Sequence, residues 1–241
     1  SYACRKGKGV HAGANRAQRW MRAIRQAHGP LFCLKADISK YFASVDHARL
    51  KAILRRHIHC DRTLRLLDAI IDSSPGRPGV GIPLGNLTSQ LFANLYLNEL
   101  DRYAKHDLGI RYYIRYMDDF VVLHHDKAQL QAWRARIEQF LWSALRLTTN
   151  SKTQIFPVGP DNGRALDFLG YRIYPTHRLL RKNSIKRIRY KLRRFKRAIA
   201  AGRLTAGDCR PCIQSWCAHA AHANTWRLRC SLFNISSGAN R

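Results

Sequence analysis

Residues 111–125 read RYYIRYMDDFVVLHH, and this stretch decides the fold. Aromatic and β-branched residues lie on both sides of Asp118 and Asp119, which predicts two strands joined by a tight turn that carries the acidic pair. Two adjacent carboxylates at a hairpin are costly unless a cation neutralises them. The stretch therefore predicts either ion pairs with Lys or Arg, or a site for divalent metal ions.

A third carboxylate ends another apolar run. Residues 32–38 read FCLKADI and predict a strand with Asp37 near its end. Carboxylates from different strands can hold two Mg²⁺ ions about 4 Å apart for phosphoryl transfer to a nucleotide. One ion then activates the attacking hydroxyl, and the other stabilises the leaving pyrophosphate. Hard oxygen ligands suit Mg²⁺, with Mn²⁺ as a substitute.

The composition points to a polyanionic partner. Of the 241 residues, 43 are Lys or Arg and 15 are Asp or Glu, so the formal net charge is +28. This charge argues against an ordinary neutral metabolic enzyme and favours nucleic acid first and an anionic membrane surface second. A hydrophobic share of 46% excludes global disorder, and the length allows a buried core.

The charges are unevenly distributed along the chain. No acidic residue precedes Asp37, and only Asp208 follows Asp167. Between Arg178 and Arg203 there are twelve Lys or Arg and no acid. This layout predicts a carboxylate-bearing centre between surfaces that bind phosphates.

Targeting signals are not visible in the sequence. No apolar run approaches the roughly 18 residues of a membrane span, and residues 1–10 are basic without an apolar segment after them. We therefore expect a cytoplasmic protein with no membrane partner, whose seven Cys are thiols. Because the chain begins at Ser1, we expect a fragment or a processed segment.

Hydrophobic periodicity predicts an α+β fold, with an antiparallel sheet backed by helices and a helical C-terminal part. The expected helices are 14–27, 47–59, 64–71, 87–105, 129–145, 184–200 and one or two in 210–228. The expected strands are 32–38, the pair in 111–125, 152–158 and 166–174. Residues 73–85 contain three Pro and four Gly and predict a loop.

Four motifs, in this order, resemble the palm and thumb of a reverse transcriptase. They are DISKYF at 37–42, YMDD at 116–119, NSKT at 150–153 and FLGY at 168–171. The similarity runs from about residue 1 to residue 230. It implies a right-hand polymerase fold, with partial fingers at 1–30, a palm at 31–177 and a helical basic thumb at 178–241.

The resemblance also implies a role for each matching residue. Asp37, Asp118 and Asp119 would bind the metal ions, helped by the backbone carbonyl of Ile38. Phe42 would lie against the sugar 2′ position and select dNTPs. The remaining expected roles are Leu84 and Gly85 in the pocket of the incoming nucleotide; Lys152 at the leaving pyrophosphate; Phe168, Leu169, Gly170 and Tyr171 at the primer end; and Lys186, Arg187, Lys191 and Arg194 on the nucleic-acid backbone.

One segment narrows the resemblance. Residues 84–90, LGNLTSQ, are similar to the reverse transcriptases of diversity-generating retroelements, which copy a template RNA into error-containing cDNA. Group II intron and retron enzymes, which keep Gln where this chain has Leu84, are the alternatives. The resemblance implies template RNA, primer, cDNA, dNTPs and a small basic accessory protein as partners, in a bacterial or phage-encoded system.

Other readings of the sequence remain open. The resemblance implies basic finger strands upstream of this region, and we expect them to lie outside this sequence. Arg5, Lys6 and Lys8 resemble a later finger–palm segment, so we do not expect them to replace those strands. A non-catalytic RNA-binding protein with a polymerase-like shell is the rival from another class. A zinc site would need an unusual ligand spacing. Its candidate ligands are Cys209, Cys212, Cys217, His219, His222 and Cys230.

Overall fold

The computed structural model describes residues 1–75, 77–83, 85–159 and 163–233. The chain divides into two compact units, Ser1–Arg164 and Ala165–Arg241. The first unit contains α1 (Val10–His28), β1 (Phe32–Asp37), α2 (Tyr41–Ser44), α3 (His47–Arg55), α4 (Asp61–Asp72), α5 (Leu87–Tyr96), α6 (Asn98–Arg102), the π-helical turn η1 (Tyr103–Asp107), β2 (Tyr113–Tyr116), β3 (Asp119–His124), α7 (Lys127–Leu145) and β4 (Gln154–Pro157). The second contains β5 (Leu166–Phe168), β6 (Tyr171–Ile173), β7 (Arg178–Leu180), α8 (Lys182–Ala200), α9 (Ala206–Ala221) and α10 (Trp226–Phe233).

The first unit is built on a four-stranded antiparallel sheet in the order β2-β3-β1-β4. The strands predicted around Asp118 are β2 and β3, and they meet in a two-residue turn because Tyr116 pairs with Asp119. Asp119 therefore begins a strand, and only Asp118 of the acidic pair lies in the turn. The predicted α+β class, with an antiparallel sheet backed by helices, is confirmed.

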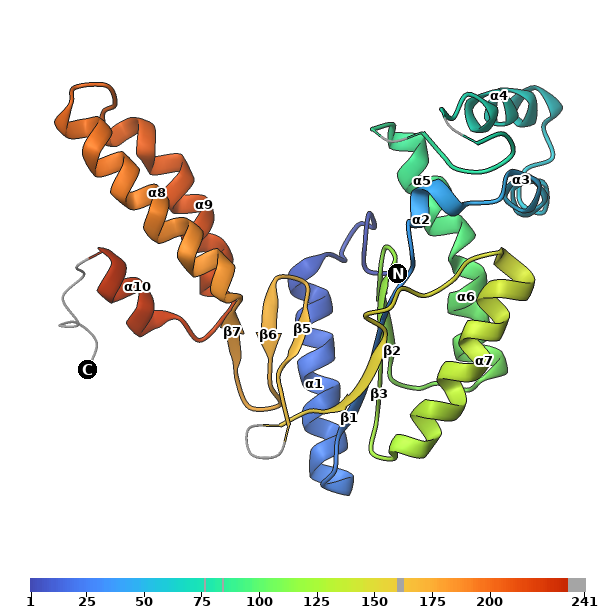
Figure 1. The fold of residues 1–241 in the computed structure, drawn as a ribbon, viewed down its shortest axis with the longest axis horizontal. Coiled ribbons are helices and arrows are strands. Elements are labelled where there is room, and N and C mark those ends of the chain that lie inside the picture. Colours follow the sequence, from blue (N-terminus) through green and yellow to red (C-terminus); the bar gives the residue numbers. More distant parts are fainter. Residues whose placement is uncertain (76, 84, 160–162, 234–241) are drawn as a thin grey trace. The chain divides into compact units, whose positions relative to one another are not determined.

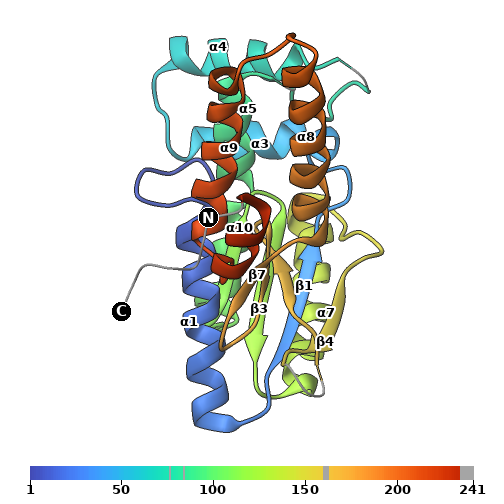
Figure 2. The same cartoon turned by 90° about the vertical axis from the view of Figure 1, so that its left-hand side faces the viewer.

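Helices cover both faces of this sheet. Figures 1 and 2 show α1 on one side and α7 on the other. Alternate residues of the central strands, such as Leu34 and Phe120, enter the main core with α5, α6 and α7. The opposite face meets the buried side of α1, which includes Met21 and Ile24. The sheet is thereby held from two sides, which fixes the position of its ends.

Three elements differ from the sequence-based expectation. The helix predicted over 87–105 is interrupted after α5 and ends in η1, where the amide of Leu108 reaches the carbonyl of Tyr103 in a wider turn. The strand predicted over 166–174 is a hairpin of β5 and β6. Residues 178–180 form β7, where the prediction began a helical part, because a three-residue strand leaves almost no periodicity to detect.

The second unit combines a small sheet with a helical hairpin. Strands β5, β6 and β7 pair antiparallel in that order. Helices α8 and α9 lie side by side (Figures 1 and 2). A capping box between Thr205 and Asp208 begins α9, and the indole of Trp216 donates to the Ser184 hydroxyl at 3.2 Å. Across the described part of the chain, no helix is long and apolar enough to cross a membrane.

Candidate active site

The sheet register brings two of the three predicted carboxylates together. Asp37, the last residue of β1, is the direct partner of Asp119, the first residue of β3. Directly opposed residues point to the same face of a sheet, so both carboxylates lie on one face at one end. Asp118 precedes Asp119 in the turn. The structure therefore gathers the three aspartates from two segments that are far apart in the sequence.

Two of the three grouped acids, Asp118 and Asp119, have raised pKa values. Burial raises the pKa of Asp119 to about 7; the Lys35 ammonium opposes this change, and the charges of Asp37 and Asp118 add to it. Burial also raises the pKa of Asp118, and the carboxylate of Asp37 contributes. Crowded, half-buried carboxylates favour a neutralising cation.

Two neighbours hold these carboxylates in place. The side-chain amide of Asn150 donates to Asp37 Oδ2 at 2.6 Å, and the Asn150 backbone amide donates to the Asp37 carbonyl at 2.8 Å. On the other strand, Lys35 Nζ lies 3.6 Å from Asp119 Oδ2. The ion pair that the sequence offered as an alternative to metal binding is thus present, but it engages only one oxygen of Asp119.

The donor set fits a hard divalent cation. Asp119 Oδ1 is buried and has no hydrogen-bond partner among the described residues, which leaves an acceptor oxygen to be satisfied. Carboxylate oxygens from two segments are the ligand type that Mg²⁺ prefers. Within the described residues, however, no group of three or more His, Cys, Asp or Glu side chains has a geometry that could hold a metal ion by itself. This result also contradicts the zinc site considered for Cys209, Cys212, Cys217, His219, His222 and Cys230.

A buried ion pair supports the hairpin of β2 and β3. Arg115 on β2 is 1% exposed, and its guanidinium donates two 2.7 Å hydrogen bonds to the Asp101 carboxylate of α6. The Tyr113 hydroxyl donates to the same carboxylate at 2.8 Å. The third guanidinium nitrogen donates to the carbonyl of Met117, which has a φ of +53°. This contact stabilises a left-handed residue immediately before Asp118.

The predicted nucleotide-pocket residues lie in three places. Phe42 is half-buried in α2, where its ring meets that of Tyr41 edge-on, with centroids 5.5 Å apart. Leu84 lies outside the described residues, and Gly85 has a φ of +94°, which favours glycine. Lys152 is exposed in the turn after Asn150, to whose side chain its backbone amide donates. Among the described residues, no interaction of the Lys152 side chain assigns it a role.

The predicted primer-end residues form a tight hairpin in the second unit. Phe168 pairs with Tyr171, and both intervening residues, Leu169 and Gly170, have positive φ values of +53° and +87°. Such a primed turn suits a two-residue hairpin, although leucine is unusual there. The Tyr171 hydroxyl lies 3.0 Å from both Nδ1 and the carbonyl of His219, which fixes the hairpin against α9.

A hollow of about 540 Å³, lined by both polar and apolar groups, lies beside this hairpin. Two of the predicted nucleic-acid contacts, Arg187 and Lys191, line it together with Gly170, Trp216 and His219. Lys186 and Arg194 also belong to α8 and are not among the lining residues. Cationic and aromatic side chains around one hollow suit a phosphate backbone with adjacent bases or sugars.

Sequence reasoning assigned no role to Lys35, Asn150, Arg115 or Asp101. Only Arg115 carries a detectable signal, since it lies at an inward-facing position of an otherwise apolar strand. The other three are ordinary polar residues in the sequence, and their contacts depend on pairings between distant segments.

Comparisons with known proteins agree with this architecture. The family described as reverse transcriptase (RNA-dependent DNA polymerase) matches residues 1–173. Protein YkfC of Escherichia coli (strain K12) is 29% identical over 223 residues, which cover 76% of this chain and 56% of YkfC. The chain therefore spans about half the length of this curated relative.

Among solved structures, the chain is similar to telomerases. The apo telomerase of Candida tropicalis, truncated from its C-terminal domain, has a TM-score of 0.56 at 14% identity, covering 70% of this chain and 39% of that one. The telomerase of the same organism in complex with a fragment of telomeric RNA has a TM-score of 0.57 at 14% identity, covering 73% and 33%. At this identity the likeness supports the polymerase fold. Together with the family match over most of its length, it leads to one conclusion: the chain belongs to the reverse transcriptase (RNA-dependent DNA polymerase) family.

Proposed function

We propose that the protein is an RNA-directed DNA polymerase that extends a primer on an RNA template by two-metal nucleotidyl transfer. The observation that carries the proposal is the register pairing of Asp37 with Asp119, beside Asp118. It is supported by the buried oxygen of Asp119 that has no hydrogen-bond partner. Carboxylates at one sheet end are the arrangement that this chemistry needs.

Each residue near the aspartates has a defined task in this proposal. Asp37, Asp118 and Asp119, with the carbonyl of Ile38, would hold two Mg²⁺ ions, which lower the pKa of the primer hydroxyl and neutralise the leaving pyrophosphate when bound. Asn150 orients the Asp37 carboxylate through its 2.6 Å hydrogen bond. Lys35 restrains one oxygen of Asp119 and leaves the other for a cation.

The expected roles in nucleotide selection are part of the same proposal. The Phe42 ring would exclude nucleotides that carry a 2′-hydroxyl. Gly85 and Leu84 would line the pocket that binds the incoming nucleotide. Lys152 would neutralise or protonate the pyrophosphate. Its exposure, and its place two residues after the Asp37 partner Asn150, are compatible with that task.

The test is primer extension on an RNA template with the full-length protein. We expect dNTP-dependent extension in Mg²⁺, a weaker or altered reaction in Mn²⁺, and none after chelation. RNA binding without extension in any divalent metal would instead favour the rival, a non-catalytic RNA-binding protein with a polymerase-like shell. A filter-binding assay on the same preparation separates the two outcomes.

For the subtype, we propose an error-prone reverse transcriptase of the diversity-generating type. The supporting feature is Leu84, because leucine can neither donate nor accept the hydrogen bonds of the Gln found in group II intron and retron enzymes. Shape alone discriminates by only about 1–3 kcal/mol. The template RNA and a small basic accessory protein would be partners in a bacterial or phage-encoded system.

Sequencing cDNA made by the wild type and by Leu84→Gln on one RNA template tests the subtype. The resemblance implies errors opposite template adenines, and these should fall in the variant. Equal error spectra would remove Leu84 from the mechanism, and accurate wild-type synthesis would favour a group II intron or retron enzyme.

A further inference from the structure

The loop before Gly85 is paired with the segment that carries Phe42. The amide of Ile82 donates to the Phe42 carbonyl at 2.9 Å, and the amide of Gly81 donates to the Val45 carbonyl at 2.7 Å. An antiparallel bridge continues this pairing by one more residue pair. The backbone of Phe42, the residue expected to select the sugar, is thus hydrogen-bonded directly to the loop that leads to the expected nucleotide pocket.

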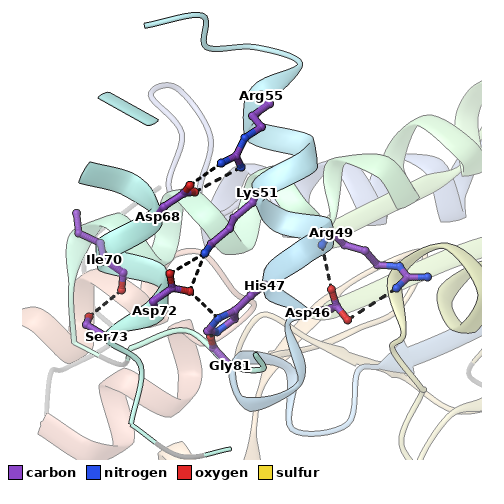
Figure 3. A network of polar contacts seen from close by, with 10 residues as sticks. All are labelled: Asp46, His47, Arg49, Lys51, Arg55, Asp68, Ile70, Asp72, Ser73 and Gly81. Carbon is purple, nitrogen blue, oxygen red and sulfur yellow. Dashed lines mark hydrogen bonds and ion pairs between the residues drawn. The ribbon is translucent and has the colours of Figure 1, made fainter. Parts of the chain in front are cut away.

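His47 secures this pairing with its side chain. It begins α3 and is 7% exposed. Its Nε2 lies 2.6 Å from the Gly81 carbonyl, and its backbone amide donates to the Gly79 carbonyl at 3.0 Å. A carbonyl oxygen only accepts, so Nε2 is the donor in this contact. One residue therefore holds the loop at two points, and Figure 3 shows His47 beside one of them, Gly81.

The other ring nitrogen of His47 faces an ion pair. Nδ1 lies 3.3 Å from Oδ1 of Asp72, at the end of α4. Lys51 Nζ is 2.7 Å from both oxygens of the same carboxylate. Hydrogen bonds from Lys51 hold the pKa of Asp72 below its ordinary value, with a smaller contribution from His47. The imidazole is oriented by a charged residue of a neighbouring helix (Figure 3).

The backbone conformation at Gly81 favours glycine, although a Cβ there would make only ordinary van der Waals contacts. Its φ is +97°, and a Cβ there would lie 3.6 Å from the carbonyl oxygens of Phe42 and Ala43 and 3.4 Å from the Ser74 hydroxyl. Further along, the Ser89 hydroxyl of α5 donates to the Pro83 carbonyl. Hydrogen bonds therefore hold the loop at Gly81 and at Pro83, on both sides of the residue that contacts Phe42.

We propose that His47 is a positioning residue for sugar selection: it sets the spacing between Phe42 and the loop that leads to Gly85. The inference rests on the proposed function, in which Phe42 excludes the 2′-hydroxyl. Loss of the imidazole would release the Gly81 carbonyl, while the backbone hydrogen bond from His47 to Gly79 would remain. The neighbouring Ile82 amide, which donates to the Phe42 carbonyl, would then be held less firmly. Asp37, Asp118 and Asp119 lie outside this network, so selection of the nucleotide should change more than the chemical step.

The experiment compares three full-length variants. His47→Phe keeps an aromatic ring and removes both ring nitrogens. His47→Gln keeps an N–H donor that can reach the Gly81 carbonyl. Arg55→Met is the matched control, because it breaks the exposed Arg55–Asp68 ion pair between the same two helices without touching the loop (Figure 3).

Two measurements are made on each variant. Amide hydrogen exchange of peptides covering 42–47 and 79–83 should accelerate at least about fivefold in His47→Phe, the factor for one net hydrogen bond, and stay at the wild-type rate in the control. In primer extension, the preference for dNTP over rNTP should fall about tenfold, since small misplacements have effects up to about 100-fold. The KM for dNTP should rise more than kcat falls. His47→Gln should restore a large part of both.

The outcomes separate the two proposals. Wild-type exchange rates in His47→Phe would overturn the positioning role whether or not the protein polymerises. Faster exchange with unchanged sugar preference would overturn the link to Phe42. Equal effects in Arg55→Met would mean that His47 only stabilises the helix pair. Absence of extension by the wild type would overturn the proposed function, while the exchange rates would still decide whether His47 anchors the loop.

Discussion

The guanidinium of Arg115 donates a 2.8 Å hydrogen bond to the carbonyl oxygen of Met117, the residue directly before Asp118. The same guanidinium is bound through two hydrogen bonds to Asp101, so the turn rests on a buried ion pair that α6 anchors. A left-handed φ at a non-glycine residue persists only where its surroundings impose it. The position of Asp118 therefore depends on a charge pair in the core of the first unit.

Arg115→Met should destabilise the protein by about 3–5 kcal/mol, because it leaves the Asp101 carboxylate buried without its cation. Urea unfolding monitored by circular dichroism measures the change. The double variant Arg115→Met/Asp101→Leu is the control and should recover much of the loss, since it removes both charges together. Equal stability of Arg115→Met and the wild type would show that the pair does not support the hairpin.

The stability contributed by Asp101 should depend on pH. Burial alone raises the pKa of its carboxyl, but hydrogen bonds from Arg115 and the positive charge of that residue outweigh burial and hold the pKa below its ordinary value. A carboxyl with a depressed folded-state pKa stabilises the fold above its unfolded pKa of about 3.9, and this contribution is lost as pH falls through the folded pKa.

Asp101→Asn tests this direction. The variant should be less stable than the wild type at pH 7, and the gap should narrow as the pH falls below about 4. Unfolding curves at a series of pH values, with both proteins measured together, cancel the titration of other acids. A gap that stays constant or widens in acid would contradict the assignment of the shift to this pair.

Asp37→Asn and Asp118→Asn should each reduce DNA synthesis at least about 100-fold, because the lost carboxylate weakens a clamp worth several kcal/mol in the transition state. Affinity for RNA should change little, since the site acts in chemistry. Single-turnover extension and filter binding on the same preparations provide the comparison. Asp126→Asn, at the beginning of α7, is a control for the loss of one acid elsewhere. Extension at the wild-type rate would remove the residue from the site.

Neutralising the basic side of α8 should weaken binding to nucleic acid and make that binding less dependent on salt. The triple variant Arg187→Gln/Lys191→Gln/Arg194→Gln should flatten the plot of log K against log salt by up to about 2.7, at about 0.9 per phosphate contact on a B-form duplex. Lys127→Gln/Arg136→Gln changes two exposed cations of α7 and should leave the slope nearly unchanged. A wild-type slope in the triple variant would mean that α8 does not contact the backbone.

Local patterns in the sequence were sufficient to predict the secondary-structure elements around the site. Aromatic and β-branched residues on both sides of Asp118 predicted the hairpin, and Asp37 was correctly placed at the end of another strand. The clustering of Pro and Gly predicted the loop at 73–85. The layout of charge predicted basic surfaces apart from an acidic centre, and α8 carries such a surface. These features depend on neighbours in the chain, so periodicity and residue type reveal them.

Only the tertiary structure decided which side chains support those elements. Arg115 of strand β2 meets Asp101 of helix α6, and Asn150 reaches Asp37 across 113 positions of sequence. His47 contacts the carbonyl of Gly81, and the sequence predicted the loop at 73–85 but not this contact. Such pairings leave no local pattern, because burial and strand register bring together polar groups whose separation in the chain is arbitrary. The sequence alone determined which residues have the chemistry for the site, and the packing of helices on the sheet decided how that chemistry is held in place.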